Sequence, residues 1–283
     1  MDRVEAHRLF FAKLIAANAC IAPGSEIEAA LASIPREQFV GPPPWKIFTR
    51  SGYVESAADD PALLYQDLVV SLGGEGPFNN GQPTLHAFCL AAMELKKGDR
   101  VVHVGAGTGY YTTLLAKLVG ETGTVDAYEI EQEFVRRAVR NLAEFPNVKV
   151  CARSGAEGPL PNCDVLYVNA GATGPLDVWL DALGPGGRLL FPMTPSDGAG
   201  AMLMITKQRD EAFAARFLLQ VQFVACIGAR DERVEQKLSE AFRNGGWAKV
   251  KSLHRNNSPD ESCWFAGNGW WLSTKETDAS LRE

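Results

Sequence analysis

Three glycines at alternate positions, Gly105, Gly107 and Gly109, carry the clearest chemical signal in this sequence. They lie between an apolar run at 100–104, which predicts a strand, and an apolar run at 110–119, which predicts a helix. Glycine lets a ligand approach the backbone where a Cβ would collide, and the ligand then lies beside the positive end of the helix. The spacing predicts a nucleotide-binding loop, with simple turn formation as the alternative.

An acidic residue, Glu129, lies 20 residues after Gly109 and ends the second predicted strand, residues 125–130. Doubly wound folds place an acid here to accept hydrogen bonds from ribose hydroxyls. We therefore predict that Glu129 binds a ribose and that its removal weakens cofactor affinity by on the order of 1–3 kcal/mol. A solvated strand end is the alternative interpretation. Glu131 is the substitute candidate, although an acid there also suits a helix start.

The spacing of the glycines also distinguishes between nucleotides. A dinucleotide loop reads GxGxxG, whereas this loop reads GxGxG followed by Tyr110-Tyr111, and no second glycine loop follows. This favours S-adenosylmethionine over NAD. The sulfonium of that cofactor carries an activated methyl group, so the protein must mainly position an acceptor in line and exclude water. A carboxylate acceptor is already ionised at neutral pH and needs no base.

Further polar residues fall near the expected ligand-binding edge of the sheet. Asn80 and Gln82 precede a helix predicted to begin near Pro83, and Asn169 follows the fourth predicted strand. Such side chains can orient an acceptor, although asparagine is also common in turns. His103, within the first predicted strand, fits two interpretations, a buried core histidine or a contact with the methionine part of the cofactor.

The elements that position these residues alternate between strand and helix. Strands are predicted near 100–104, 125–130, 148–152, 164–169, 188–191, 202–206 and 217–224, with helices near 83–95, 110–119, 131–145, 176–183 and 232–242 and a turn at 184–187. Strands that alternate with helices imply right-handed βαβ units. We therefore predict an α/β fold with a doubly wound, mostly parallel, Rossmann-like sheet.

The two ends of the chain differ from this pattern. The first 35 residues predict two helices. The first has an apolar stripe of Leu9, Phe10, Leu14 and Ile15, and the second starts at Ser25 and Glu28, which have capping-box spacing. Residues 41–81, rich in Pro, Gly, Ser and Asp, predict a partly irregular lid. After residue 227 the tail contains Trp247, Trp264, Trp270 and Trp271, which predict packing on the core or against a second copy in a homodimer.

These patterns predict three regions: an N-terminal helical and lid segment at 1–80, a cofactor-binding core at 81–226 and a tryptophan-rich extension at 227–283. The formal charge is 28 − 34 = −6 without a long run of like charges, so nucleic acid is an unfavoured partner. The charged start, Met1 to Glu5, and the lack of an 18-residue apolar window argue against a signal peptide and a membrane span. The six cysteines are scattered without a CxxC pair, which indicates neither a disulfide framework nor a metal site. We expect a cytoplasmic location.

The sequence from about Ile34 to Gly228 resembles the protein-L-isoaspartate (D-aspartate) O-methyltransferase family of class I S-adenosylmethionine-dependent methyltransferases. The resembling stretches are 34–40 (IPREQFV), 81–83 with 92–93, 104–110 (VGAGTGY), 125–129 with 141–142, 186–189 with Pro192, and 221–224 (VQFV). The glycine motif is common to the whole superfamily, and the flanking stretches are more specific. The resemblance implies S-adenosylmethionine as cofactor and a carboxylate of a peptide, protein or small acid as acceptor.

Three positions depart from the family pattern. The family has an acid where this chain has His103, a Gly-Asp-Gly run that holds adenine where this chain has residues 154–158, and a hydroxyl residue associated with the acceptor carboxyl where this chain has Gly81. The predicted cofactor-binding residues are His103, Gly105, Ala106, Gly107, Thr108, Gly109, Tyr110, Glu129, Ile130, Gly155, Ala156 and Asn169, and the predicted catalytic residues are Asn80, Gln82 and Asn169.

Three hypotheses follow. The leading hypothesis is methyl transfer from S-adenosylmethionine to a carboxylate oxygen. The second, motivated by Gly81 and the missing acids, is a catalytically diverged cofactor-binding or protein-interaction module of the same fold. The third, an NAD-dependent oxidoreductase, is disfavoured by the glycine spacing.

Overall fold

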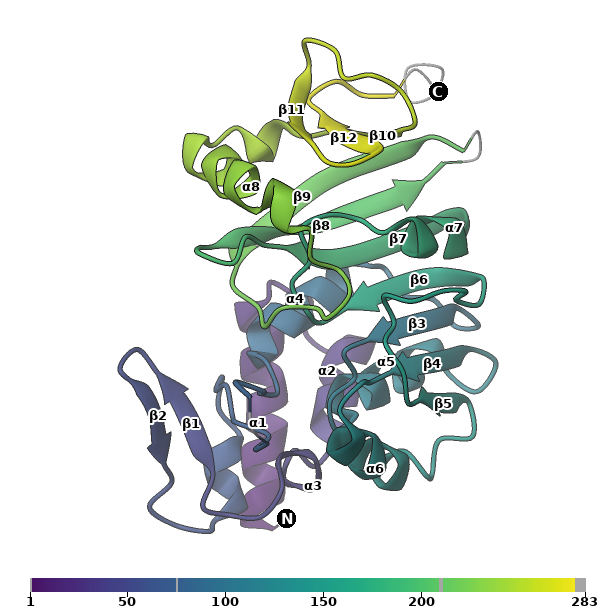
Figure 1. The fold of residues 1–283 in the computed structure, drawn as a ribbon. Helices are drawn as coiled ribbons and strands as arrows, with labels where there is room; N and C mark the ends of the chain where they lie inside the picture. Colours follow the sequence, from purple (N-terminus) through teal and green to yellow (C-terminus); the bar gives the residue numbers. More distant parts are fainter. Residues whose placement is uncertain (1, 75, 209–210, 278–283) are drawn as a thin grey trace. The chain divides into compact units, whose positions relative to one another are not determined.

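A computed structural model, drawn in Figure 1, describes residues 2–74, 76–208 and 211–277. Its contacts divide the chain into two units, which are described separately below. The first unit comprises Met1–Asp99 and Ala106–Ala152, and the second comprises Arg100–Gly105 and Arg153–Glu283.

The first unit begins with two packed helices, α1 (Arg3–Asn18) and α2 (Glu26–Ser33). The Ser25 side chain caps α2 by accepting a hydrogen bond from Glu28 N, as the sequence predicts, and the Glu28 carboxylate accepts from Gly24 N. The predicted apolar stripe of α1 is wrong except at Ile15. Leu9, Phe10 and Leu14 are exposed, whereas Phe11, Ala12, Ile15 and Ala16 are buried. The buried face of α1 is thus rotated by about one residue from the predicted one. Its contacts with α2 and α4, and not the size of its side chains, determine which face is buried.

The predicted lid contains more regular structure than expected. After the short helix α3 (Glu37–Val40), strands β1 (Lys46–Thr49) and β2 (Gly52–Glu55) form an antiparallel hairpin, followed by the 3₁₀ helix η1 (Pro61–Leu64). β1 also bonds residues 69–71 through Phe48 N to Val69 O and Ser71 N to Lys46 O. Trp45, Leu64, Val70 and Leu72 of this segment form one buried cluster with Val40 and Phe134, so the lid packs on residues outside it.

The rest of the first unit follows the predicted helix and strand order. It contains α4 (Pro83–Ala92), α5 (Tyr110–Val119), β4 (Thr124–Tyr128), α6 (Gln132–Asn141) and β5 (Val148–Cys151). β4 and β5 pair in parallel, with Tyr128 opposite Cys151. Glu129 therefore lies one residue beyond the end of β4, rather than inside the predicted strand.

The second unit contains three parallel strands, β3 (Arg100–Val104), β6 (Cys163–Val168) and β7 (Leu183–Met193), with α7 (Asp177–Ala182) before β7. The turn predicted at 184–187 lies inside β7. The pairing of β6 with β7 shifts there from Cys163–Leu183 to Val165–Arg188, because the glycine-rich segment bulges while the strand continues on both sides. The parallel pairs in both units confirm the α/β class.

The second unit continues with antiparallel strands β8 (Gly200–Lys207) and β9 (Phe213–Val221). The tail adds α8 (Glu232–Asn244), the 3₁₀ helix η2 (Trp247–Lys249) and strands β10 (Ser252–Arg255), β11 (Cys263–Ala266) and β12 (Trp270–Ser273), which extend the same sheet in the order β9-β10-β12-β11 (Figure 1). Phe217 of β9 contacts Phe242, Trp247 and Trp264 edge to face. The tail therefore packs on the core of its own unit.

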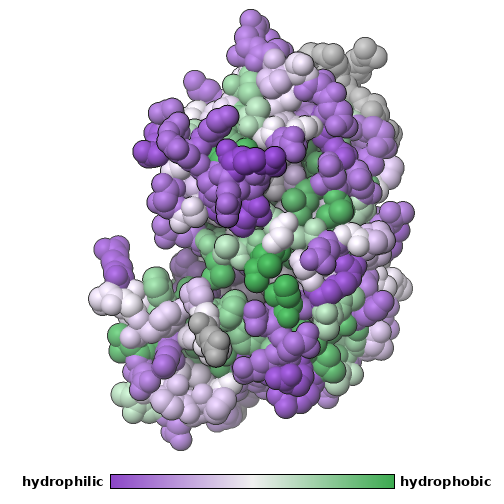
Figure 2. Space-filling view, viewed as in Figure 1, coloured by the Kyte–Doolittle hydropathy of each residue, from purple (hydrophilic) through white to green (hydrophobic). Residues whose placement is uncertain are grey.

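The outer face of α8 is polar. Its exposed side chains include Glu232, Arg233, Lys237 and Glu240, and Figure 2 shows this region, at the upper left, as strongly hydrophilic. Among the described residues, no helix combines the length and apolar character needed to cross a bilayer.

Candidate functional site

The first unit positions residues 106–109 of the glycine loop at the start of α5. Gly107 and Gly109 have φ angles of +55° and +97°. A Cβ at Gly109 would lie 2.9 Å from Leu142 Cδ1, so a side chain there meets both backbone strain and a collision. Between them, Thr108 Oγ1 donates to Phe39 O at 2.6 Å, and Asn141 Nδ2 donates to Thr108 O at 2.8 Å. Phe39 and Asn141, which are distant in sequence, thus hold the loop in its conformation.

Glu129 faces this loop within the first unit. Its Oε2 accepts from Gly107 N at 2.6 Å, and its Oε1 accepts from the N–H groups of Ile130 and Glu131, both at 2.9 Å. The residue is 7% exposed. Burial raises the pKa of its carboxyl above the ordinary glutamate value, although the three N–H groups act in the opposite direction. A buried carboxylate therefore connects the end of β4 with the glycine loop.

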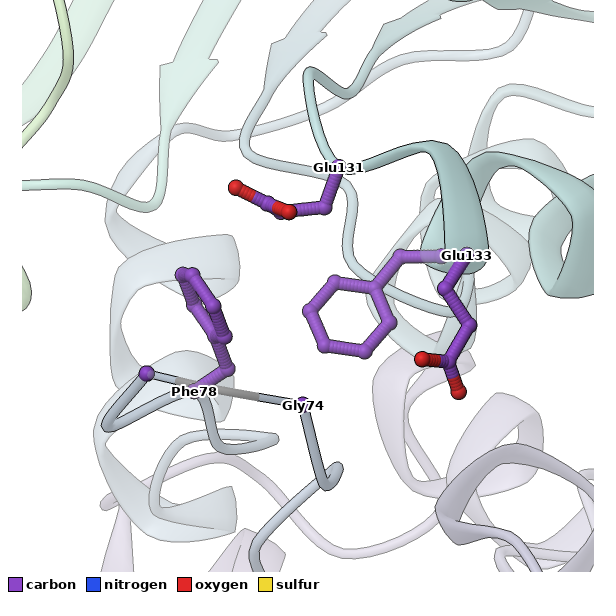
Figure 3. Close-up of a pocket in the computed structure, with 6 residues that line it drawn as sticks. Gly74, Phe78, Glu131 and Glu133 are labelled. Atoms are coloured by element: carbon purple, nitrogen blue, oxygen red, sulfur yellow. The ribbon is translucent and has the colours of Figure 1, made fainter.

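A pocket opens in the first unit between the lid and the start of α6. Its volume is about 430 Å³, and it is lined by Gly74, Gly76, Phe78, Glu131, Glu133 and Phe134. Phe78 and Glu131 project toward the same open space (Figure 3). Ile130, the residue between the two acids Glu129 and Glu131, is 40% exposed and presents an apolar surface.

The second unit contains the other predicted cofactor residues. Gly105, with φ +76°, and Asn169 directly follow the parallel strands β3 and β6. A Cβ at Gly105 would lie 3.4 Å from the carbonyl carbon of Asn169. His103 is fully buried, and its Nε2 lies 2.8 Å from Asn169 Nδ2. The structure thus brings together three residues that the sequence analysis identified separately.

The loop after β5 contains Gly155 and Ala156. Trp179 Nε1 donates to Gly155 O at 2.8 Å, and Ala156 N donates to Ser154 Oγ at 3.1 Å. A Cβ at Gly155 would lie 2.5 Å from Val104 Cγ2, at the end of β3. Gly155 therefore allows this loop to lie directly against the end of β3.

Asn80 and Gln82, the predicted acceptor residues of the first unit, are engaged with the protein itself. Asn80 is 8% exposed, its Oδ1 accepts from Val70 N at 2.8 Å, and its own N–H donates to Val70 O at 2.9 Å. Gln82 is exposed, and its Nε2 donates to Asp67 Oδ2 at 2.9 Å. Asn80 thus has a clear structural role in the lid, whereas Gln82 remains at the surface.

The space above Gly81 is filled by an imidazole. A Cβ built on Gly81 would lie 2.1 Å from His86 Nε2, and the His86 ring stacks on Tyr111 at 3.7 Å between centroids. At the position where the family resemblance places a hydroxyl residue, this fold therefore leaves no room for a side chain while His86 keeps its place.

We expect Gly81→Ser to lower the free energy of unfolding by about 1–3 kcal/mol, because the new side chain displaces His86 and the backbone has φ +68°. In a His86→Ala protein, where the space is open, Gly81→Ser should cost less stability than it does in the parent. Urea unfolding of the parent, both single variants and the double variant measures the two costs. A Gly81→Ser protein as stable as the parent, or an equal cost in both backgrounds, contradicts the clash.

Arg36 is a residue whose role the sequence analysis missed. It is fully buried and donates to the carbonyl oxygens of Leu64, Gln66 and Leu68, all in the lid. Its guanidinium also lies over the rings of Phe11 and Tyr110, at 5.2 and 5.8 Å. The sequence contains little signal for this role, because Glu37 and Gln38 follow Arg36 directly and make it resemble a surface residue.

Comparison with known proteins identifies the family to which this chain is similar. A family model described as protein-L-isoaspartate(D-aspartate) O-methyltransferase matches residues 12–231. A protein-L-isoaspartate O-methyltransferase from Brucella anthropi is 29% identical over 205 residues, covering 70% of this chain and 84% of the relative. One from Ignicoccus hospitalis is 29% identical over 206 residues, covering 71% and 89%.

Two solved structures show the same fold. One, named protein-L-isoaspartate O-methyltransferase, has a TM-score of 0.65 at 21% identity and covers 88% of this chain and 73% of that chain. The other, from Plasmodium falciparum and in complex with S-adenosyl-L-homocysteine, has a TM-score of 0.62 at 18% identity and covers 78% and 98%.

Proposed function

This chain belongs to the protein-L-isoaspartate (D-aspartate) O-methyltransferase family, and from that premise we propose that it transfers a methyl group from S-adenosylmethionine to a carboxylate oxygen. The observation that carries the proposal is the buried Glu129 carboxylate against the glycine loop. Membership of this family, together with the class I methyltransferase fold, disfavours the hypothesis of a mere interaction module.

The residues present fit this cofactor. In the first unit, the positive φ angles and close contacts of Gly107 and Gly109 form a cradle that side chains would fill. Glu129 supplies acceptor oxygens for ribose hydroxyls, and the exposed Ile130 supplies an apolar surface for a base. In the second unit, Asn169 Oδ1 is buried without a hydrogen-bond partner and can accept from a ligand.

When bound, S-adenosylmethionine supplies a methyl group already activated by its sulfonium. The protein's task is then to bind, orient and exclude water. We propose that Gly105, Ala106, Gly107, Thr108, Gly109 and Tyr110 form the cofactor loop, with Glu129 and Ile130 at the nucleoside and Gly155 and Ala156 at the base. The acceptor carboxylate is ionised at neutral pH and attacks without a general base.

The acceptor class follows from the names of the relatives. Proteins such as the one from Brucella anthropi are named for isoaspartyl residues in proteins, so we propose a polypeptide isoaspartyl carboxylate, with a small acid as the alternative. Gln82, exposed before α4, is the proposed acceptor contact of the first unit. The three-region division at residues 80 and 226 and a homodimer through the tail remain predictions.

Labelled-methyl transfer tests the proposal. The full chain is incubated with methyl-labelled S-adenosylmethionine and either an isoaspartyl peptide or the matched aspartyl peptide. We expect label only in the isoaspartyl peptide, released as methanol by mild base because the product is an ester. Base-stable label indicates transfer to nitrogen or an ether oxygen and contradicts a carboxylate acceptor. Absent binding of S-adenosylhomocysteine in titration calorimetry contradicts the proposed cofactor.

A further inference from the structure

Asn169 and His103 form a pair at the carboxyl ends of two parallel strands in the second unit. His103 of β3 lies opposite Tyr167 of β6, and Asn169 is two residues further along. Because alternate residues of a strand share a face, these three side chains lie on one face of the sheet. The 2.8 Å contact between Asn169 Nδ2 and His103 Nε2 therefore crosses diagonally between neighbouring strands.

The direction of this hydrogen bond follows from the amide nitrogen of Asn169 together with a neutral His103 ring. Burial lowers the pKa of His103 to about 3, so the imidazole is neutral near pH 7. An amide Nδ2 can only donate, so His103 Nε2 must accept. The His103 ring also stacks on Tyr167 at 5.7 Å between centroids and 11° between planes. The ring thus holds the Asn169 amide in one of its two orientations.

The other end of that amide has no partner. Asn169 Oδ1 is shielded from water and accepts no hydrogen bond within the described part of the chain. Asn169 lies beside Gly105, whose missing Cβ would approach Asn169 Cβ to 3.7 Å. Ligands of open α/β sheets bind beyond the carboxyl ends of the strands, where both residues lie. A buried, unpaired acceptor in this place is suited to a ligand that donates a hydrogen bond.

We propose that Asn169 Oδ1 accepts a hydrogen bond from the amine of the cofactor's methionine part, and that His103 is the positioning residue that orients it. The inference rests on the proposed function and refines it, because Asn169 then contacts cofactor rather than acceptor. The pair is uncharged and stands where the family resemblance places an acid at position 103. It contacts the cationic amine without burying a carboxylate.

Titration calorimetry on the full chain tests this with two ligands, S-adenosylhomocysteine and its deamino analogue, in which hydrogen replaces the amine. We expect the parent to prefer S-adenosylhomocysteine by about tenfold, the effect of one hydrogen bond to a charged group. Asn169→Ala should remove this preference and leave the affinity for the analogue unchanged. His103→Phe, which keeps a ring beside Tyr167 but lacks Nε2, should reduce the preference for S-adenosylhomocysteine. Asn169→Asp should show the preference that Asn169→Ala lacks, because aspartate has an acceptor oxygen at this position.

The results distinguish a wrong amine assignment from a wrong proposed function. If Asn169→Ala weakens both ligands equally, or leaves the preference intact, the amine assignment is wrong while the proposed function stands. If the parent protein binds neither ligand, the proposed function itself fails, and this inference fails with it. Unchanged affinity for the analogue also shows that each variant is folded.

Discussion

Replacing Arg36 with methionine lowers the free energy of unfolding by about 3–5 kcal/mol, the largest stability effect that we expect in this chain. The substitution keeps an unbranched apolar stem but removes the donors to Leu64 O, Gln66 O and Leu68 O. The three carbonyls lose these donors, although Gln66 O still accepts from Leu68 N, and Phe11 and Tyr110 lose a cation over their rings. Urea unfolding followed by circular dichroism measures the loss.

Two variants show whether the loss comes from these contacts. Arg136→Met removes an exposed arginine and should change stability by less than about 0.5 kcal/mol. Arg36→Lys keeps the charge, but its ammonium lacks the planar set of donors with which the guanidinium reaches three carbonyls. It should therefore recover only a minor part of the lost stability. A lysine variant as stable as the parent indicates that charge alone matters and contradicts the bridging role.

Replacing Glu129 with alanine weakens S-adenosylhomocysteine binding roughly 100-fold, equivalent to about 3 kcal/mol. This is the upper end of the range expected from the sequence. The structure explains why, since the variant loses the proposed ribose acceptor and also the bond that ties Gly107 N to the end of β4. Titration calorimetry measures the change. Glu131→Ala, which alters the neighbouring pocket but keeps Glu129, is the control, and an equal loss there contradicts the assignment.

The same carboxyl predicts a pH dependence. Because burial raises its pKa, Glu129 takes up a proton at a higher pH than an exposed glutamate. Cofactor affinity of the parent should fall as the pH falls through this raised value, whereas the affinity of Glu129→Ala should stay flat. For folding the sign is opposite. A raised pKa in the folded state means that protonation of Glu129 favours folding, so its titration cannot explain the lost affinity by unfolding.

The backbone positions of the proposed cofactor loop were predictable from local sequence. Gly105 to Tyr110 and Glu129 are each adjacent to a strand end, so their backbone positions follow once strands and helices are placed. Within the first unit, the Glu129 carboxylate accepts a hydrogen bond from Gly107 N, a contact that the spacing did not predict, and its ribose role remains a prediction. The helix cap at Ser25 was also predictable, because it depends on four consecutive residues.

The acceptor side was less predictable. From sequence, Asn80 and Gln82 were equivalent polar residues near a helix start, yet Asn80 Oδ1 is bound to Val70 N while Gln82 is exposed. The apolar stripe of α1 was misplaced for a similar reason, since both of its faces contain large apolar residues and only packing chooses between them. The direction of a side chain depends on neighbours from other parts of the chain.

By itself, the sequence of this methyltransferase-family protein determined the order of the strands and helices from α4 to α8 and the glycine loop, because these depend on spacing along short stretches. It did not predict the β1–β2 hairpin or strands β10, β11 and β12. Only the tertiary structure decided that His86 fills the space above Gly81, that Arg36 holds the lid carbonyls, and that His103 orients Asn169 across 66 positions. Such contacts join residues far apart in the chain, and only packing determines which atoms meet.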